Sequence, residues 1–334
     1  MRHRKRHSRV ARLPCRWAPI LPAMWVPQPS LARAGDSTLV DPPGSARLWL
    51  PPLGLSSCIR GLMLRDTMSL DLDHQALVNH FPVTFNCGLT WVLQGRAEEL
   101  LPGEGGHGTG PSVPLASNFV FNGPFNRPLA GRYPQPSKLL VLAIMPDAFT
   151  LLTGLQPGDY LNRMVPVQEV LGAPWQQMGQ AVFDAASDEE RMAVIEARLG
   201  AWWQAVRPAA PAVSHLMDDW LQGLSARAST SSLGRSARQI ERRIKQWTGQ
   251  PLRELRGVSR SERAFFQAAM AHEEGDVNWA EVADEAGYTD QSHLCRQTRR
   301  LTGFSPEELR RRIATDEGFW MYRLWGFSEI NRQK

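Results

Sequence analysis

The stretch NWAEVADEAGYTDQSHLCRQTRRLTG, residues 278–303, decides how the carboxyl-terminal third of this chain folds. Its first part predicts a short helix over 279–286, and Gly287 predicts a turn after it. Asp290 is placed to cap a second helix over 291–302. A short helix, a glycine turn and a capped helix with Gln and Arg on its outer face are typical of a helix-turn-helix unit.

A second stretch, LGRSARQIERRIKQWTG at 233–249, has the same character. Ser236 is a favourable N-cap for a helix over 237–248, and Gly249 suits the position after its last turn. The helix would bury one apolar stripe and expose basic and amide side chains, which contact bases in the major groove. A connecting helix over 251–272 would span roughly 30 Å, close to the ~34 Å turn of B-DNA. The two outer helices would therefore fit successive major grooves.

Residues 233–312 resemble the DNA-binding domain of the AraC/XylS family of bacterial transcription regulators. The resemblance lies in a Gly-Tyr-x-Asp-x-Ser-His signature, a following Gly-x-Ser-Pro and an arginine in the last helix. The matching residues are Gly287, Tyr288, Asp290, Ser292, His293, Arg296, Gly303, Ser305, Pro306 and Arg310. The resemblance implies a seven-helix, all-α domain that binds double-stranded DNA. The sequence departs from the family at Thr298, where a buried Phe is usual, and at Cys295, where a Ser is common.

The resemblance also assigns DNA contacts to individual positions. The residues at base-facing family positions are Arg238, Glu241 and Arg242 in the first unit, and Gln291, Ser292 and Arg296 in the second. The residues better placed for phosphates, which contribute affinity rather than sequence information, are Lys245, Arg299 and Arg300. Gln239 and His293 complete the predicted DNA-binding set. His293 has two alternative roles: it contacts DNA near the bases, or it supports the cap of the helix.

The preceding part of the chain predicts a sensor or dimerisation domain over 46–224. Short apolar runs between 46 and 144 indicate strands, among them a hairpin-like pair at 83–85 and 89–93. Helical patterns follow at 147–154, 174–183, 188–206 and 212–224. The order loosely resembles the cupin-like sensor domains of the same family. The expected fold class is therefore α+β: a cupin-like β unit with packed helices, then an all-α domain with two helix-turn-helix units.

Three segments are expected outside the two domains. Residues 1–45 form a basic, proline-broken tail that we expect to be disordered, and a later start at Met24, Met63 or Met68 is an alternative. Residues 225–232, SARASTSS, are small and polar and indicate a linker before a DNA-binding domain over 233–315. Residues 316–334 are expected to be a tail.

Composition narrows the function classes. The 334 residues, 43% hydrophobic, suit two domains with ordinary cores, and the formal charge of +5 is compatible with a polyanionic partner. No apolar run approaches the ~20 residues of a membrane-spanning helix, so we expect a cytoplasmic protein without membrane contact. Four scattered cysteines and the lack of a His-x-His pair argue against a zinc site or a metal-dependent oxygenase. We expect no cofactor and no catalytic constellation.

Together these patterns predict a sequence-specific transcription regulator that responds to a small-molecule effector. Possible further partners are a second copy of the chain, through the helices at 174–206 and 212–224, and RNA polymerase if the protein is an activator. Those helices would otherwise cover the sheet. Aromatic residues of the first domain either line an effector pocket or form plain core; they are Trp91, Phe119, Phe121 and Phe125. The alternative function is an enzymatic or ligand-binding amino-terminal domain with an appended DNA-binding part.

Overall fold

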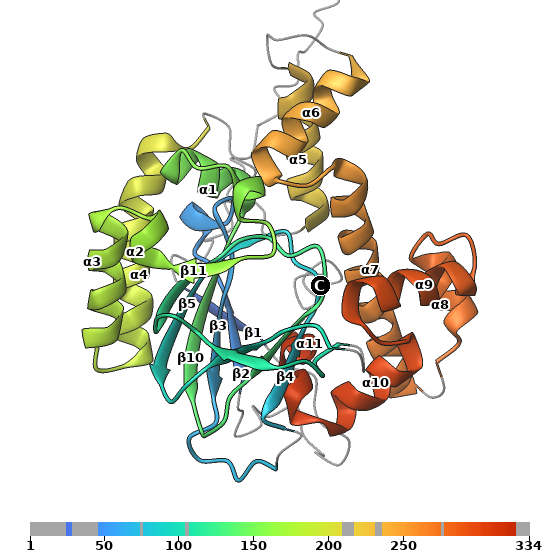
Figure 1. Cartoon of the computed structure of the whole chain (residues 1–334). Helices are drawn as coiled ribbons and strands as arrows, with labels where there is room; N and C mark the ends of the chain where they lie inside the picture. Colours follow the sequence, from blue (N-terminus) through green and yellow to red (C-terminus); the bar gives the residue numbers. More distant parts are fainter. Residues whose placement is uncertain are drawn as a thin grey trace, which may run out of the picture.

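The structure is a computed structural model, and it shows the predicted α+β architecture, with strands first and helices after them (Figure 1). It describes residues 25–28, 46–73, 76–103, 107–208, 217–230, 236–274 and 277–324. None of the described helices combines the length and the apolar character needed to cross a membrane.

Two antiparallel sheets form the first domain. The larger sheet has the order β1-β2-β3-β10-β5-β8-β11, and the smaller one the order β4-β9-β6-β7. The strands of the larger sheet are β1 Val26–Gln28, β2 Ala46–Leu50, β3 Ile59–Asp66, β5 Cys87–Gln94, β8 Phe119–Asn122, β10 Lys138–Ile144 and β11 Met164–Pro166. Those of the smaller sheet are β4 Val78–Phe81, β6 Glu98–Leu100, β7 Ser112–Pro114 and β9 Leu129–Arg132.

Two sequence predictions for the strands were wrong. Residues 83–85 do not form a hairpin with β5; Thr84 makes an isolated bridge with Phe125, while β5 pairs with β10 and β8. Part of the predicted disordered tail is β1, whose Val26 lies opposite Leu50 of β2. Both errors have the same cause, since the strand partner lies more than 20 residues away and a local pattern does not show it. Of the other residues of 1–45, all but Trp25 lie outside the described part of the chain.

Helices cover the larger sheet on one side. They are α1 Pro146–Thr153, α2 Val167–Val170, α3 Ala173–Asp184 and α4 Asp188–Val206, with the short turns η1 Leu53–Leu55 and η2 Pro157–Tyr160. The indole Nε1 of Trp91 donates to Gly179 O of α3 at 3.3 Å. A Cβ at Gly179 would lie 2.1 Å from the Phe119 ring, so this contact between helix and sheet requires glycine. Within the described chain, α3 and α4 therefore cover the sheet with their apolar stripes.

The remaining helices form the second domain. They are α5 Met217–Thr230, α6 Ala237–Thr248, α7 Leu252–Glu274, α8 Trp279–Glu285, α9 Gln291–Thr302, α10 Pro306–Thr315 and α11 Trp320–Leu324, with the turn η3 Glu317–Phe319 before α11. α5 packs on α6 as α8 packs on α9, so α5 is the first helix of the first helix-turn-helix unit. The predicted linker was wrong over residues 225–230, which are the last turns of α5.

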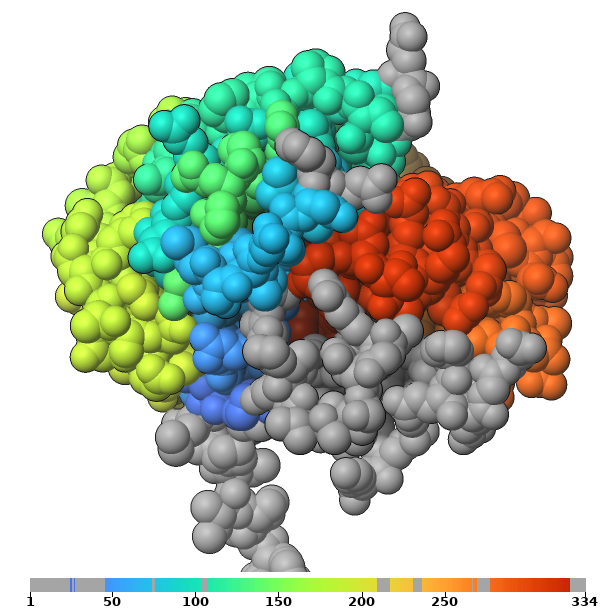
Figure 2. All heavy atoms as spheres, turned by 90° about the horizontal axis from the view of Figure 1, so that it is seen from below, coloured from blue at the N-terminus to red at the C-terminus, as the bar shows by residue number. Residues whose placement is uncertain are grey.

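Residues 316–324 are not the predicted tail. η3 packs on β4, and α11 packs on β2 and β4, so the end of the DNA-binding part returns to the sheets. Seen from below, these red segments lie against the blue and cyan strands (Figure 2). Phe319, Trp320 and Tyr322 are each at most 1% exposed, which explains why the segment folds back. Residues 325–334 lie outside the described part.

One apolar cluster runs through both domains. It includes Leu89 of the sheet and Trp203 of α4, and it continues into Trp220, Ile244 and Leu301 of the helix-turn-helix units. The first unit is thus packed on the sheet domain rather than tethered to it. Because the core is shared, a disturbance in the first domain can reach the helices that carry the DNA-binding side chains.

Candidate nucleic-acid interface

Both outer helices are fixed at both ends by local sequence. At the start of α6, Ser236 and Gln239 form a reciprocal capping box. At the start of α9, Asp290 accepts a hydrogen bond from His293 N at 2.6 Å. Gly249 and Gly303 close the helices with φ of 75° and 86°, left-handed values that favour glycine. These caps explain why the predicted bounds of both helices match the structure.

The exposed face of α6 carries most of the predicted side chains. Arg238, Arg242 and Lys245 are exposed, while Ile244 is buried in the core. Arg238 and Arg242 are one turn apart, so they lie above each other on the same face. This face has the basic character that binding in the major groove requires.

Two of the predicted residues of α6 already have structural roles. Gln239 is half-buried and its side chain belongs to the capping box. Glu241 Oε2 accepts a hydrogen bond from Leu252 N, at the start of α7, at 3.3 Å. The carboxylate of Glu241 thereby ties the end of the first unit to the connecting helix.

The exposed face of α9 carries Gln291, Ser292, Arg296 and Arg299. Arg300 is also on the surface, but its Nη1 lies 2.6 Å from Glu254 Oε2 of α7. A phosphate contact by Arg300 would compete with this ion pair.

His293 lies at the buried edge of α9. Its half-buried ring packs edge-on against Tyr288, with ring centroids 5.2 Å apart. Its backbone N–H is the one that Asp290 caps. Of the two alternatives for His293, contact near the bases and support of the helix cap, both contacts favour the second.

α7 sets the separation of the two units. Its 23 residues give a length of about 34 Å at 1.5 Å per residue. α7 packs on α5 and α6 of the first unit and on α8 and α9 of the second (Figure 1). The first half of α7 also contacts α9, since Gln297 lies beside Gly257 and Arg300 pairs with Glu254. The hydroxyls of Ser261 and Tyr288 join α7 to the second unit at 2.9 Å.

Thr298 leaves a small gap under α9. A cavity of about 20 Å³, room for roughly one water, is lined by Thr298, Leu294 and Phe265 among others. Thr298 is 8% exposed, so it occupies the buried position that the larger Phe usually takes in the family that this sequence resembles. The second unit therefore has a looser core than a Phe at 298 would give it.

Two histidines lie where the second unit meets the smaller sheet. The His80 ring is 5.2 Å from that of Phe304, 4.7 Å from that of Phe319 and 5.2 Å from that of His107. Burial lowers the pKa of His80 to about 3, and the neighbouring His107 and Arg312 add to this shift because a proton on His80 would be repelled by their charged forms. Burial also lowers the pKa of His107. Neutral rings are therefore part of this contact.

We expect the fold to lose stability on acidification because of His80. Its pKa of about 3 in the folded chain is below the ordinary value near 6.5, so the unfolded chain binds more protons in between. The contribution is complete above pH ~6.5 and falls towards pH ~3, by at most about 1.4 kcal/mol per pH unit. Urea unfolding between pH 7.5 and 4.5 measures it. His80→Phe should flatten the profile, and an unchanged slope in that variant would assign the loss to other groups.

Comparison with known proteins agrees with this geometry. Residues 230–312 match the protein family described as a helix-turn-helix domain. No curated protein matches the chain. Solved structures with some likeness include apo ToxT from Vibrio cholerae, with 12% identity over 74% of this chain and 96% of that chain, and a TM-score of 0.34. ToxT bound to an unsaturated fatty acid has 12% identity over 70% and 93%, with a TM-score of 0.31.

The AraC-like transcriptional activator CuxR has 14% identity over 89% of this chain and 90% of that chain, with a TM-score of 0.27. TM-scores this low do not establish a shared placement of the two domains. The match of the helix-turn-helix family covers both outer helices, their caps and the connecting helix. Residues 230–312 are therefore a helix-turn-helix domain of the AraC type, the DNA-binding part of a transcription regulator.

Proposed function

We propose that the protein binds a two-part DNA site with α6 and α9 in successive major grooves and responds to a small molecule held in its first domain. The observation that carries the proposal is the pair of capped helices with exposed arginines, joined by a helix about as long as one turn of DNA. Two such helices would cover a half-site of roughly 15–20 base pairs. We also propose that the protein regulates transcription in the cytoplasm. Its proposed partners there are a second copy of the chain and, if it is an activator, RNA polymerase.

The effector part of the proposal is supported by a cavity of about 240 Å³ between the two sheets. Phe125 lines it, whereas three of the four aromatic residues considered for a pocket belong to the core: Trp91, Phe119 and Phe121. The second domain closes the cavity with α7 and α11, through Val258, Glu262 and Trp320 among others. A molecule in the cavity would touch the helix that connects the two DNA-binding units, and would bias their disposition.

We expect Arg242→Ala and Arg296→Ala each to weaken binding to the specific site by ~1–3 kcal/mol, with little effect on random DNA. Each removes a bidentate base contact while leaving the buried faces of α6 and α9 intact. Capture of genomic fragments by the purified protein would find the site, and fluorescence anisotropy would measure affinity for it and for random duplexes at one salt concentration. The matched control is Arg198→Ala, an exposed arginine of α4.

A uniform loss on all sequences would show that the two arginines contact phosphates. Failure of the wild-type protein to enrich any two-part site, with and without cell extract as a source of effector, would contradict the proposed function. An effect of Arg198→Ala as large as that of Arg242→Ala would point to net charge rather than to the two recognition helices.

A further inference from the structure

We infer that the cavity between the two sheets takes a small, mainly apolar molecule that carries a cationic hydrogen-bond donor, such as an arylalkylammonium. The inference rests on the proposed effector role of this cavity and adds the chemical class of the occupant. It is carried by the size of the cavity, its unpartnered oxygens and the charges in its wall.

The size and lining of the cavity fix the apolar part of the occupant. A volume of about 240 Å³ exceeds the ~150 Å³ that holds benzene and is below the ~300–1,000 Å³ of drug-sized pockets. One ring with a short chain therefore fits. The apolar lining comes from both sheets and includes Leu48, Met63, Phe81, Val120, Leu139 and Met164.

Four buried polar atoms of the lining have no hydrogen-bond partner among the described residues. One, Trp320 Nε1, is a donor, and the other three are acceptors: Asn86 Oδ1, Glu98 Oε2 and Asn122 Oδ1. A buried acceptor without a donor is unfavourable, so these oxygens favour an occupant that donates. The oxygen and nitrogen of each Asn amide would exchange places if the amide were turned over, so the two Asn residues alone do not fix the need for a donor. The carboxylate of Glu98 has only acceptor atoms, and it therefore favours a donor in either case.

The charges in the wall also favour a cation. Among the described lining residues, Arg60 is positive, whereas Glu98 and Glu262 are negative. Arg60 is already engaged, since its Nη2 lies 2.5 Å from Glu262 Oε2 and its guanidinium lies over the Phe85 ring at 5.0 Å. A ligand carboxylate would have to displace Glu262 from Arg60 and would still face Glu98. An ammonium group meets Glu98 without breaking a contact.

Three probes with one apolar skeleton test the inference: phenylbutylamine, phenylbutanol and phenylbutyrate. Their binding to the full-length protein is measured by calorimetry without DNA. We expect the amine to bind at least about tenfold more tightly than the alcohol, as one charge-assisted contact allows, and the carboxylate to bind most weakly. Glu98→Gln should remove the advantage of the amine over the alcohol and leave the affinity for the alcohol within about twofold.

The place of binding is tested with Val141→Trp, which fills the cavity, and with Val113→Trp as matched control, since Val113 is exposed on β7 and does not line the cavity. The first should abolish binding of the amine and the second should not. The Glu98→Gln comparison carries the test if Val141→Trp does not fold. Equal or tighter binding of the carboxylate, binding of none of the probes, or undiminished binding to folded Val141→Trp would each overturn the inference.

DNA binding is a separate measurement. Loss of the amine preference with intact binding of a two-part DNA site would refute the ligand class alone. Absence of a specific DNA site would instead refute the proposed function, whatever the probes do.

Discussion

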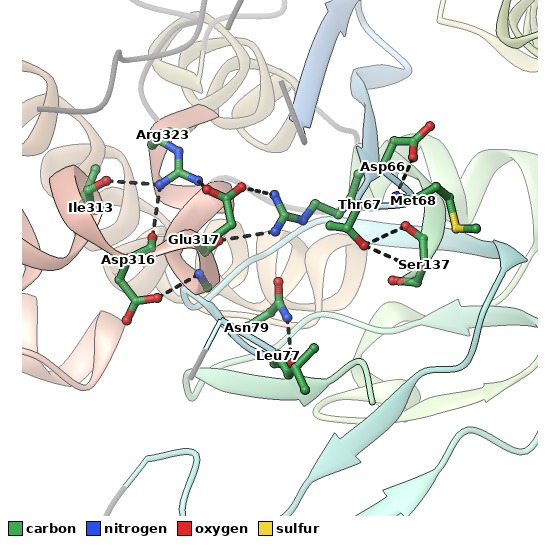
Figure 3. A network of polar contacts seen from close by, with 12 residues as sticks. Asp66, Thr67, Met68, Leu77, Asn79, Ser137, Ile313, Asp316, Glu317 and Arg323 are labelled. Atoms are coloured by element: carbon green, nitrogen blue, oxygen red, sulfur yellow. Dashed lines mark hydrogen bonds and ion pairs between the residues drawn. The ribbon is translucent and has the colours of Figure 1, made fainter. Parts of the chain in front are cut away.

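Glu317→Ala is expected to lower the free energy of unfolding by about 3–5 kcal/mol, because it breaks a buried ion network. The carboxylate of Glu317 is 6% exposed and lies 2.5 Å from Arg65 Nη1 of β3 and 3.0 Å from Arg323 Nη2 of α11. Arg323 also donates to the carbonyls of Ile313 and Asp316 at 3.1 Å. Figure 3 shows Glu317 and Arg323 between the end of α10 and the sheet. Without the carboxylate, two buried guanidiniums lose the negative charge that they share.

Glu307→Ala is the matched control for this prediction. Its carboxylate pairs with Arg310 one turn away on the surface of α10, and the Glu307 side chain is 57% exposed. We expect a cost of at most about 1 kcal/mol for that exposed pair. Urea unfolding followed by tryptophan fluorescence and circular dichroism compares the two variants. Equal costs would mean that the network around Glu317 does not hold the end of the chain on the sheet.

The Glu317 network matters for function because of where it lies. It fixes η3 and α11 on the sheet domain, and α11 supplies Trp320, Met321 and Leu324 to the wall of the cavity. The Arg65 guanidinium also lies 5.6 Å from the centroid of a Trp320 ring. The end of the DNA-binding part therefore lies next to the cavity, and a molecule bound there would contact α11 directly.

Local sequence predicted the helices that carry their own end signals. α4, α6 and α9 have the predicted bounds, because Ser187, Ser236 and Asp290 each accept a hydrogen bond from the first turn. The strands β3 and β10 were also anticipated, because each contains a short apolar run. Such signals act over three or four residues and require no knowledge of distant parts of the chain.

The errors fall where distant contacts decide. Residues 225–230 continue α5 because distant contacts hold them: Ala228 is buried in the apolar cluster that both domains share, and Arg227 pairs with Asp147 of α1. Small polar composition alone indicates a linker equally well. For residues 316–324 the sequence did indicate a buried segment, because Phe319, Trp320 and Tyr322 are too apolar for a solvated tail. Only the sheet surface that buries them explains the fold of this segment.

The predicted DNA-binding set shows the same division. The spacing of Arg238 and Arg242, and of Gln291 and Arg296, is enough to place them on exposed faces, as the structure has them. The additional bonds of Glu241 and Arg300 were not predictable, because their partners lie on α7, 11 and 46 residues away in sequence. Their contact with DNA stays a prediction.

Trp220→Ala should cost about 3–5 kcal/mol, the usual range for removing a large buried aromatic side chain. Trp220 of α5 is 4% exposed and stacks on Phe85 of the first domain with ring centroids 5.0 Å apart. Its Nε1 donates to Asp147 Oδ1 of α1 at 2.8 Å, and Arg227 pairs with the other oxygen of the same carboxylate. The residue therefore joins the first helix-turn-helix unit both to the sheet and to α1.

Trp220→Phe separates the two contributions. It keeps an aromatic ring against Phe85 but removes the donor to Asp147, whose carboxylate retains Arg227. We expect a cost of ~1–3 kcal/mol for that unmet acceptor and the smaller ring. Because α5 supports α6, Trp220→Ala should also weaken specific DNA binding by more than Trp220→Phe does, at temperatures where both variants remain folded. Equal stability and equal affinity of the two variants would show that the stacked contact does not hold the first unit on the sheet domain.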